Sequence, residues 1–511
     1  MIQRDGYAIS LWQDHAAPYA AAGSADAAVV YDVIIAGGGI TGISTALLLQ
    51  KAGKRCLVLE AAQLCFGTTG GTTAHLNTLL DTPYTTIRQN FGAAEAAMVA
   101  QATAAAIRLI RSHIGAYGID CGFAEADAYL FAQDAQQEEE LAGILEDARA
   151  AGLQAAYSST IPVPIPFTKA LKAGGQAKFN PVQYVYSLAQ ALEQAGGVIL
   201  QECRVTRVTE NSVVEVTTSR GVFKAVDLVY ATHIPPGVNL LHLRCAPYRS
   251  YAMAVSLQDG AYPQDLIYDM YDPYHYYRTQ EVGGRQYLIA GGKDHKTGHE
   301  PHTERCFLEL ESYLRQYFDI AAVHYKWSSQ FFEPADGLPY IGHLPGHPGH
   351  IYVATGFGGN GMVYSSVSAL LIRNMILGEE TPYSHLFDPN RIKPVAGFTS
   401  FVQHNADVVK QFAGKLFSGE QLHQLAGLAP GEAKIVVYDD RKIALYKDEA
   451  GALHAVNPVC THLKCEVKWN AAERSWDCPC HGARYGCDGE VLTGPADQGL
   501  APVQIMSSVH Q

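Results

Sequence analysis

The sequence predicts an α/β protein of more than one domain that ends in a small, strand-rich unit. Residues 31–36 form a short run rich in β-branched side chains, and an apolar helical stretch and a second apolar strand ending at Glu60 follow it. That order is typical of a strand–helix–strand unit in a parallel sheet. Residues 431–511 differ, because they combine short strand signals with a tight group of Cys and His side chains. A chain of 511 residues is long enough for two or three domains with substantial cores.

The first strand–helix–strand unit carries the glycine spacing of a dinucleotide-binding site. Gly37 permits a tight turn after the strand, Gly39 allows the backbone to approach a pyrophosphate, and Gly42 allows the helix to pack closely. The N–H groups at the start of the helix can bind the phosphates. Glu60 is placed to accept hydrogen bonds from a ribose hydroxyl, and a glycine turn without a ligand does not explain this acid.

Four residues near the C-terminus have the spacing C-x-H followed by C-x-x-H: Cys460, His462, Cys478 and His481. Two thiolates and two imidazoles suit a [2Fe–2S] cluster that has cysteine on one iron and histidine on the other. A structural zinc site is the alternative, but C-x-H is not a usual zinc spacing. The segment resembles the Rieske family from roughly residue 430 to the C-terminus. This resemblance implies a disulfide between Cys465 and Cys480, as in Rieske proteins of the cytochrome bc type.

One position in the second cluster loop departs from the high-potential Rieske pattern. Those loops read C-H-G-S-x-Y, and their Ser and Tyr hydroxyls donate hydrogen bonds to sulfurs. This chain keeps Tyr485 but has Ala483 in place of Ser. Because hydrogen bonds to the sulfurs raise the reduction potential, we expect an intermediate potential.

A second glycine-rich segment repeats the first spacing at Gly356, Gly358 and Gly361, after an apolar strand at residues 351–355. No strand ending in an acid follows it, so it is a poor nicotinamide site. The segment instead resembles the C-terminal flavin motif of the D-amino-acid-oxidase-like (DAO) superfamily of FAD-dependent oxidoreductases, in which the helix start faces the flavin ring. A partial positive charge there would stabilise the anionic reduced flavin.

Other segments resemble the same superfamily, and together they cover about residues 31–390. Residues 227–233 look like its A-T-G strand, with His233 in place of Gly, and residues 336–342 resemble its D-G-x-P-x-I-G run. The resemblance implies that FAD is bound by a scattered set of residues: Gly37, Gly39, Gly42, Glu60, Thr68, Thr69, Thr72, Thr73, Ala74, Val205, Thr232, Gly337, Gly356, Gly358, Gly359, Gly361 and Met362.

The resemblance also implies the domain organisation. We expect an α/β Rossmann-type FAD-binding domain with an α+β antiparallel-sheet substrate domain, followed by a small all-β Rieske domain. The expected segments are an N-terminal extension at 1–30, FAD-binding pieces near 31–110, 180–245 and 330–390, substrate-domain pieces near 111–179 and 246–329, a linker helix within 391–430 and the Rieske domain at 431–511. The linker helix is predicted from helical spacing between Val402 and Leu416.

Two groups of side chains are candidates for the chemistry. His75 ends a Thr- and Gly-rich segment that in the DAO superfamily passes beside the flavin ring. It could hydrogen-bond the flavin, touch the substrate or link covalently to the flavin. Arg278, with Tyr277 and two further tyrosines nearby, is the second candidate, because a guanidinium fork matches a substrate carboxylate bidentately. A surface arginine on a strand is the alternative.

Composition limits the partners. The net charge is −13, with 48% hydrophobic and 17% charged residues, and there is no basic stripe to neutralise phosphates. We therefore expect no nucleic-acid partner. The apolar stretch at residues 29–49 contains Asp32 and three consecutive glycines, so we expect a strand, turn and helix rather than a membrane span. No secretory signal is evident, and we expect a cytoplasmic protein in which the disulfide persists only if it is buried.

These observations predict a flavo-iron–sulfur oxidoreductase. A small-molecule substrate, an amine or an amino acid, would reduce FAD, and the electrons would pass singly to the Rieske cluster and then to an external acceptor. One alternative is an NAD(P)H-dependent reductase that feeds a partner oxygenase. Another is a non-catalytic redox sensor. The oligomeric state is not predicted.

Overall fold

The computed structural model describes residues 4–391, 420–421, 428–438 and 441–504 of the chain. The linker helix predicted between Val402 and Leu416 lies outside these residues. The helices are α1 (Leu11–Asp14), α2 (Ile40–Lys51), α3 (Thr68–Gly71), α4 (Tyr84–Phe91), α5 (Ala93–Tyr117), α6 (Ala135–Ala150), α7 (Pro181–Gln194), α8 (Thr303–Leu314), α9 (Gly361–Leu377), α10 (Ser384–Phe387) and the 3₁₀ helix η1 (Leu240–Leu243).

The first sheet has a parallel core, in the order β16-β17-β10-β1-β2-β7, and the hairpin β8-β9 extends from β10. Only β16 on the path and the hairpin run antiparallel. Its strands are β1 (Val30–Ala36), β2 (Cys56–Leu59), β7 (Val198–Leu200), β8 (Val205–Glu210), β9 (Val214–Thr218), β10 (Gly221–Tyr230), β16 (Tyr340–His343) and β17 (Ile351–Thr355). This arrangement is the α/β fold predicted from the first strand–helix–strand unit.

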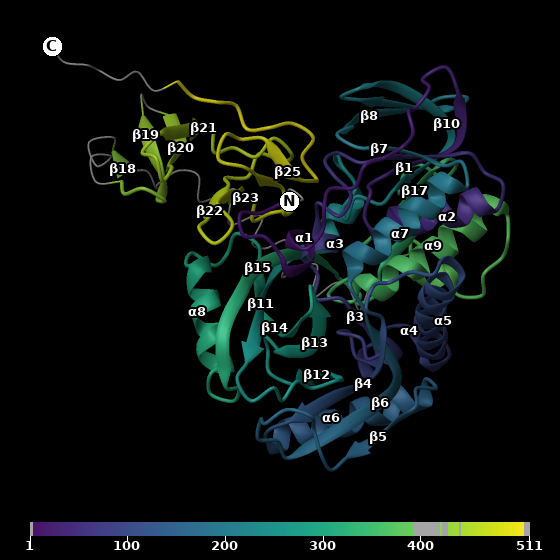
Figure 1. Ribbon diagram of the computed structural model, residues 1–511. Coiled ribbons are helices and arrows are strands. Elements are labelled where there is room, and N and C mark those ends of the chain that lie inside the picture. Colours follow the sequence, from purple (N-terminus) through teal and green to yellow (C-terminus); the bar gives the residue numbers. More distant parts are fainter. Residues whose placement is uncertain (1–3, 392–419, 422–427, 439–440, 505–511) are drawn as a thin grey trace.

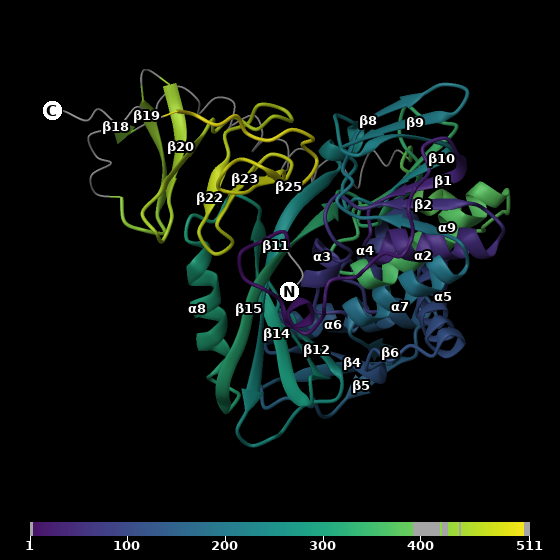
Figure 2. The same cartoon turned by 45° about the horizontal axis from the view of Figure 1, so that its top comes forward.

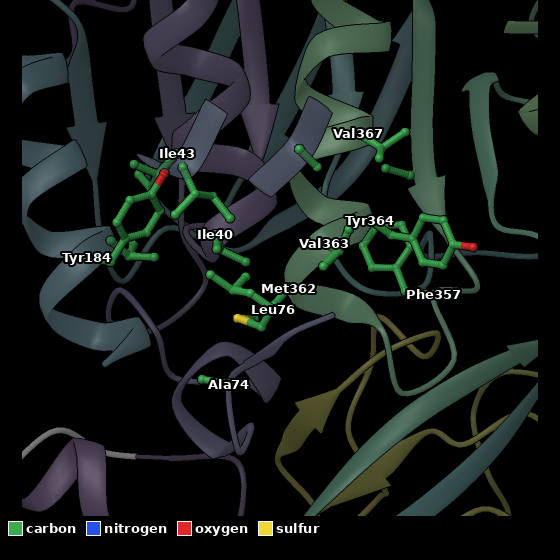
Figure 3. Close-up of a cluster of buried hydrophobic side chains, with 14 of the residues drawn as sticks. Ile40, Ile43, Ala74, Leu76, Tyr184, Phe357, Met362, Val363, Tyr364 and Val367 are labelled. Carbon is green, nitrogen blue, oxygen red and sulfur yellow. The ribbon is translucent and has the colours of Figure 1, made fainter. Parts of the chain in front are cut away.

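Helices α2, α7, α9 and α5 pack together beside this sheet (Figure 1). Figure 3 shows how their side chains meet: Ile40 and Ile43 of α2 lie near Tyr184 of α7 and Val363 of α9. All four side chains are almost completely buried in the largest hydrophobic cluster. The packing fixes the starts of α2 and α9 side by side, at the carboxyl ends of the parallel strands.

The second sheet is mostly antiparallel and has the order β15-β11-β14-β13-β12-β4-β6-β3, with β5 paired to β6. Its strands are β3 (His75–Leu76), β4 (Ala124–Ala132), β5 (Ala155–Ser158), β6 (Lys169–Lys178), β11 (Cys245–Leu257), β12 (Leu266–Asp269), β13 (Tyr276–Val282), β14 (Arg285–Lys296) and β15 (Ile320–Pro334). Because β3 follows α3 after only three residues, the chain passes from the Thr- and Gly-rich segment around α3 into this sheet at His75.

The C-terminal unit contains two four-stranded sheets. One comprises β18 (Glu420–Gln421), β19 (Ala433–Tyr438), β20 (Arg441–Lys447) and β21 (Leu453–Val456), and the other β22 (Lys468–Asn470), β23 (Ser475–Asp477), β24 (Arg484–Tyr485) and β25 (Val491–Thr493). Figures 1 and 2 show the second of these sheets against the ends of β11 and β15, whereas the first projects away. The small all-β unit predicted for the C-terminus is confirmed.

The N-terminal segment packs into the protein. Trp12 in α1 is fully buried, and its indole N–H donates a hydrogen bond to the Thr72 carbonyl oxygen at 2.6 Å. Gln13 donates from its side chain to the Cys65 carbonyl oxygen. These contacts join the start of the chain to the segment that leads into β3.

One helix in the described part of the chain, α5, is long and apolar enough by length and composition to cross a membrane. It packs against α4, α7 and α9. Ala102, Ile107 and Ile110 on its inner face belong to the largest hydrophobic cluster. This placement is that of a core helix.

Candidate redox site

One long cavity joins the carboxyl ends of the parallel strands to the face of the second sheet. Its walls include the ends of β1, β2 and β10, the start of α9, and residues of β11, β13, β14 and β15. The carboxyl edge of a parallel sheet is where doubly wound folds bind their ligands. The cavity is therefore the place to test the predicted dinucleotide site.

At one end of the cavity the glycine loop after β1 leaves no room for side chains. Gly37 has φ of +112°, and a Cβ there would lie 2.4 Å from the Ala231 carbonyl oxygen. A Cβ on Gly42 would lie 1.9 Å from the Gly37 carbonyl oxygen, which explains how α2 packs directly on the loop. Gly37 and Gly39 line the cavity, and α2 begins behind them without a side-chain cap. The loop can bring its backbone against a phosphate.

Glu60 lies beside this loop at the end of β2. Its Oε2 accepts a hydrogen bond from the Gly38 N–H at 2.6 Å, and its Oε1 accepts one from the Ala62 N–H at 2.8 Å. Burial raises the pKa of Glu60, while these backbone donors and the charge of Arg204 oppose the shift. Arg204 and Val205 line the same end of the cavity. A carboxylate and a guanidinium thus flank the space for a dinucleotide.

The second glycine segment opens on the same cavity. Gly358, Gly359, Gly361 and Met362 line it, and α9 begins at Gly361 without a side-chain cap hydrogen bond. Two helix N-termini, those of α2 and α9, therefore face one cavity. This arrangement fits a ligand that has a pyrophosphate at one helix and an electron-rich ring at the other.

Most of the remaining predicted FAD contacts also line the cavity: Thr68, Thr69, Thr72, Thr73 and Thr232. Ala74, Gly337 and Gly356 do not, which corrects the prediction. Ala74 is fully buried, and its carbonyl oxygen accepts a hydrogen bond from Arg278. Gly337 and Gly356 have φ of +91° and +73°, so they serve backbone turns near the cavity rather than its lining.

His75 on β3 lies where the cavity meets the second sheet. Its Nδ1 is 2.7 Å from the Tyr268 hydroxyl, which also accepts a hydrogen bond from the Asn77 side chain at 3.0 Å. Burial, and then the positive charges of Arg278 and Lys178, lower the pKa of His75 well below its usual value. The ring is therefore neutral near pH 7, and the Tyr268 hydroxyl can donate to Nδ1.

Arg278 is not placed for its predicted role in holding a substrate carboxylate. Its side chain is fully buried and does not line the cavity. The guanidinium donates hydrogen bonds to three main-chain carbonyl oxygens, those of Thr73, Ala74 and Phe179, at 3.0, 2.6 and 3.1 Å. It also contacts the Gln280 side chain. The structure thus contradicts the prediction, because Arg278 lies outside the lining of the cavity and its Nη1 holds the segment that leads into β3.

Tyr277, the other predicted catalytic residue on this strand, does not line the cavity either. Successive side chains of a strand point to opposite faces of the sheet. Tyr276 on β13 lines the cavity, as does Tyr274 just before the strand, whereas Tyr277 is buried on the other face beside Phe318. The prediction of Tyr277 is therefore wrong, because the neighbouring Tyr276 of the same strand faces the cavity instead.

The four predicted cluster residues meet at one place in the C-terminal unit. The thiols of Cys460 and Cys478 lie beside each other and interact. The ring centroids of His462 and His481 lie 5.0 Å apart. Nδ1 of each histidine is buried without a hydrogen-bond partner among the described residues. Two adjacent thiols and two imidazoles whose Nδ1 atoms have no partner fit a centre that takes two thiolates and two imidazoles.

The surroundings of these residues match the Rieske pattern in part. The Tyr485 hydroxyl lies 3.1 Å from the Cys460 sulfur, whereas Ala483 is fully buried and offers no side-chain donor. Cys465 and Cys480 form a disulfide between the two loops, as the resemblance implied. Both disulfide cysteines are buried, which is the condition for persistence in a reducing compartment.

The histidine edge of the cluster loops faces the N-terminal part of the protein. His462 Nε2 lies 3.1 Å from the Gly237 carbonyl oxygen, and the adjacent Pro236 lines the cavity. His242 of η1 is buried beside both rings, with centroid distances of 4.6 Å to His462 and 6.0 Å to His481. No sequence motif singled out His242, because it approaches the cluster loops only through the fold.

A second contact joins the cluster loops to the N-terminal part of the protein, through Gln330 of β15. The Gln330 side chain donates a hydrogen bond to the Gly482 carbonyl oxygen at 2.8 Å, and the Gln330 carbonyl oxygen accepts one from Thr68 at 2.9 Å. The C-terminal unit also supplies part of the cavity wall, through Thr493 and Asp497 among others. The cavity and the cluster loops therefore share a wall.

Six buried charged side chains form what we call the interdomain charge network: Arg4, Asp5, Arg249, Glu473, Asp477 and Arg484. Arg484 lies 3.2 Å from Asp5 and 3.1 Å from Asp477. Arg249 of β11 lies 3.8 Å from both Glu473 and Asp477. The network joins the N-terminal segment, the second sheet and the cluster-bearing sheet, so it fixes how the C-terminal unit is seated.

Known proteins resemble both parts of the chain. A family model described as FAD dependent oxidoreductase matches residues 32–375, and one described as Rieske [2Fe-2S] domain matches residues 421–504. YhfW of Bacillus subtilis (strain 168), named as a Rieske 2Fe-2S iron-sulfur protein, is 34% identical over 478 residues, which are 93% of each chain. The cytochrome b6-f complex iron-sulfur subunit of Microcystis aeruginosa (strain NIES-843 / IAM M-2473) is 38% identical over 97 residues, 19% of this chain and 49% of that protein.

Solved structures resemble the larger part. Glycine oxidase from Geobacillus kaustophilus has a TM-score of 0.58 and 19% identity, over 71% of this chain and 99% of that one. L-proline dehydrogenase from P. horikoshii has a TM-score of 0.57 and 17% identity, over 71% and 97%. At these identities the likeness shows the fold alone. From the family matches and the two sites, the chain belongs to the FAD-dependent oxidoreductase family, takes FAD as its cofactor, and carries a C-terminal Rieske domain with a [2Fe–2S] cluster.

Proposed function

We propose that the protein oxidises the CH–NH unit of a small molecule, an amine or an amino acid, and delivers the electrons through its own Rieske domain to an external acceptor. The substrate loses two electrons and two protons as it becomes an imine. FAD supplies a two-electron acceptor that can be emptied one electron at a time, which is what a one-electron cluster requires.

Two separate sets of residues would hold the two cofactors. The glycine loop at residues 37–39, Glu60 and the starts of α2 and α9 would hold the dinucleotide. The cluster would be held by two thiolates and two imidazoles, from Cys460, Cys478, His462 and His481. Tyr485 would donate a hydrogen bond to the Cys460 sulfur.

One observation carries the proposal: the cavity and the cluster loops share a wall within one chain. His462 contacts Gly237, whose neighbour Pro236 lines the cavity. Thr493 and Asp497 of the Rieske domain line the cavity directly. This seating supports an electron path that needs no second molecule of the protein.

The second glycine segment argues against a reductase that takes its electrons from NAD(P)H. Gly358 and Gly361 open on the same cavity as Gly37 and Gly39 rather than on a dinucleotide site of their own. A nicotinamide would then compete with the substrate for the space beside His75. The arrangement favours a small substrate.

The test is anaerobic mixing of purified holoenzyme with a panel of amines, amino acids, NADH and NADPH. Flavin absorbance and the electron paramagnetic resonance signal of the reduced cluster are followed together. We expect an amine or amino acid to bleach the flavin and the cluster signal to grow afterwards. Bleaching by NADH or NADPH alone, or flavin reduction that never reaches the cluster, would overturn the proposal.

A further inference from the structure

The end of the cavity beyond the start of α9 is lined by carboxylates and phenols. Asp81, from the loop between β3 and α4, and Asp294 of β14 both line it. Tyr274 lies beside the Asp81 carboxylate, and Ser250 lies beside that of Asp294. The Ser250 hydroxyl is 2.9 Å from the hydroxyl of Tyr276. The two acids thus have neutral polar side chains rather than cations beside them.

The aromatic side chains form a continuous wall around this space. The ring centroids of Tyr274 and Tyr276 are 5.7 Å apart, those of Tyr276 and His75 are 5.6 Å apart, and those of His75 and Tyr268 are 5.3 Å apart. Because His75 is neutral, this wall brings no positive charge to the two carboxylates. Faces of tyrosine rings attract cations.

No Lys, Arg or His in the described part of the chain lies within ion-pair distance of Asp81 or Asp294, whereas Asp127 and Glu215 each have a lysine partner. The Oδ1 atom of Asp294 is buried without a hydrogen-bond partner among the described residues. Burial raises the pKa of Asp81 to about 6 and that of Asp294 to about 8, and Asp81 and Glu333 add to the shift of Asp294 by repulsion. Asp81 is exposed and Asp294 is partly buried, and both line the cavity. The buried Oδ1 of Asp294 has no counter-ion, and a bound cation would supply one.

We propose that this end of the cavity binds the ammonium group of a cationic amine, with Asp81 and Asp294 as its counter-ions and Tyr274 and Tyr276 as its aromatic walls. The inference rests on the proposed function, because it names the substrate class for the same cavity. It narrows the class from amines or amino acids to amines that present no carboxylate at this end.

The same geometry disfavours amino acids. A substrate carboxylate placed here would face the negative charge of Asp81, and that of Asp294 as well at a pH above its raised pKa. The cations that could receive it are used elsewhere, because Arg278 holds main-chain carbonyl oxygens, and Lys178 donates to Gln264 and Thr279. Arg204 lines the cavity but lies at the dinucleotide end beside Glu60.

The experiment measures binding separately from turnover. Tetramethylammonium, which cannot be oxidised by loss of a proton from nitrogen, is titrated into the oxidised holoenzyme by calorimetry, with acetate as the anionic probe. We expect tetramethylammonium to bind and acetate not to bind. Asp294→Asn should raise the Kd by about tenfold or more, as the loss of one buried ion pair implies. Asp294→Glu, which keeps the charge, should retain most of the affinity.

The matched control is Glu139→Gln, which removes an exposed acid on α6 that does not line the cavity. It should leave the Kd close to the native value, and the flavin spectrum reports that each variant is loaded and folded. Binding of acetate, or an equal Kd for the native protein and Asp294→Asn, would overturn the inference. If tetramethylammonium binds through Asp294 but no amine reduces the flavin, the inference stands and the proposed function fails.

Discussion

Two regions of this protein hold acidic side chains, and they differ in whether arginines accompany the carboxylates. In the interdomain charge network each carboxylate faces at least one arginine, as Asp477 faces Arg484 at 3.1 Å. Burial alone would raise the pKa of Asp477, but Arg484 and Arg249 hold it below its usual value. At the substrate end of the cavity, Asp294 has no such partner, and burial raises its pKa to about 8.

The difference separates a structural use of charge from a ligand-binding one. A buried ion pair fixes a geometry, and removing one member leaves an uncompensated charge. An acid without a cation, such as Asp294, keeps its place open for one from outside the chain. The network therefore explains how the Rieske domain is seated, and under our proposal the cavity acids select the molecules that bind.

The largest expected effect comes from breaking the network. Arg484→Met removes the nearest cation of Asp477 and one of the two arginines that lie 3.2 Å from Asp5, so we expect a loss of about 3–5 kcal/mol in the free energy of unfolding. Urea denaturation followed by circular dichroism measures it. Lys468→Met is the control, because Lys468 is half exposed and its acid Glu466 keeps Lys442. Its cost should stay below about 1 kcal/mol, and equal costs would contradict the distinction.

A second change disturbs the seating without touching a charge. A Cβ on Gly298 would lie 3.0 Å from Pro479, which stands between the cluster residue Cys478 and the disulfide residue Cys480, and Gly298 has φ of +73°. Gly298→Ala should displace this loop and slow cluster reduction by about tenfold or more, since small misplacements cost large factors in rate. The cluster content should remain unchanged, as measured by iron analysis.

Gly346→Ala is the matched control for that variant. Gly346 also has positive φ, but a Cβ there would meet nothing within 4 Å. It therefore reports the effect of backbone strain alone. If both variants slow cluster reduction equally, the contact with Pro479 does not position the loop.

The acids of the cavity give a pH dependence of cation binding. Their raised pKa values, about 6 for Asp81 and about 8 for Asp294, mean that both are neutral in acid and become charged as the pH rises. Tetramethylammonium keeps its charge throughout, so its Kd should fall by about tenfold between about pH 6 and about pH 9. Asp272 and Glu333 face the same acids and broaden the transition. In calorimetry, the Asp294→Asn variant should lose the part of this change in Kd that occurs at higher pH. A Kd that does not change with pH in the native protein would refute the prediction.

The smallest expected effect concerns the cluster alone. Ala483→Ser should add a hydroxyl donor beside the cluster sulfurs and raise the midpoint potential in voltammetry. Ala472→Ser is the control, because Ala472 is equally apolar and buried but packs on the second sheet. An unchanged midpoint in the Ala483 variant would show that its hydroxyl does not reach a sulfur.

The sequence predicted features whose signal is local. The glycine loop, Glu60 and the four cluster residues lie at short, characteristic spacings, and each spacing reflects one turn or loop that the chain makes without help from distant segments. Of the catalytic candidates, only His75 lines the cavity, and the resemblance to the DAO superfamily singled it out rather than any spacing.

Features that depend on packing escaped prediction. The register of a strand decides which face of the sheet each side chain points to, and a run of tyrosines does not reveal that register. The sequence therefore does not distinguish Tyr276 from Tyr277. Arg278 was misassigned because its partners are main-chain carbonyl oxygens of distant segments. Asp81, Asp294 and the interdomain charge network come from parts of the chain far apart in sequence, so only the fold brings them together.

The most direct test of the central claim asks whether electrons pass from flavin to cluster within one chain. The flavin of anaerobic holoenzyme is reduced by a light pulse, and the growth of reduced cluster is followed at several protein concentrations. The shared wall at Gly237 and His462 leads us to expect a first-order rate that does not change with concentration. A rate that rises in proportion to protein concentration would contradict the account, because transfer would then require an encounter between molecules.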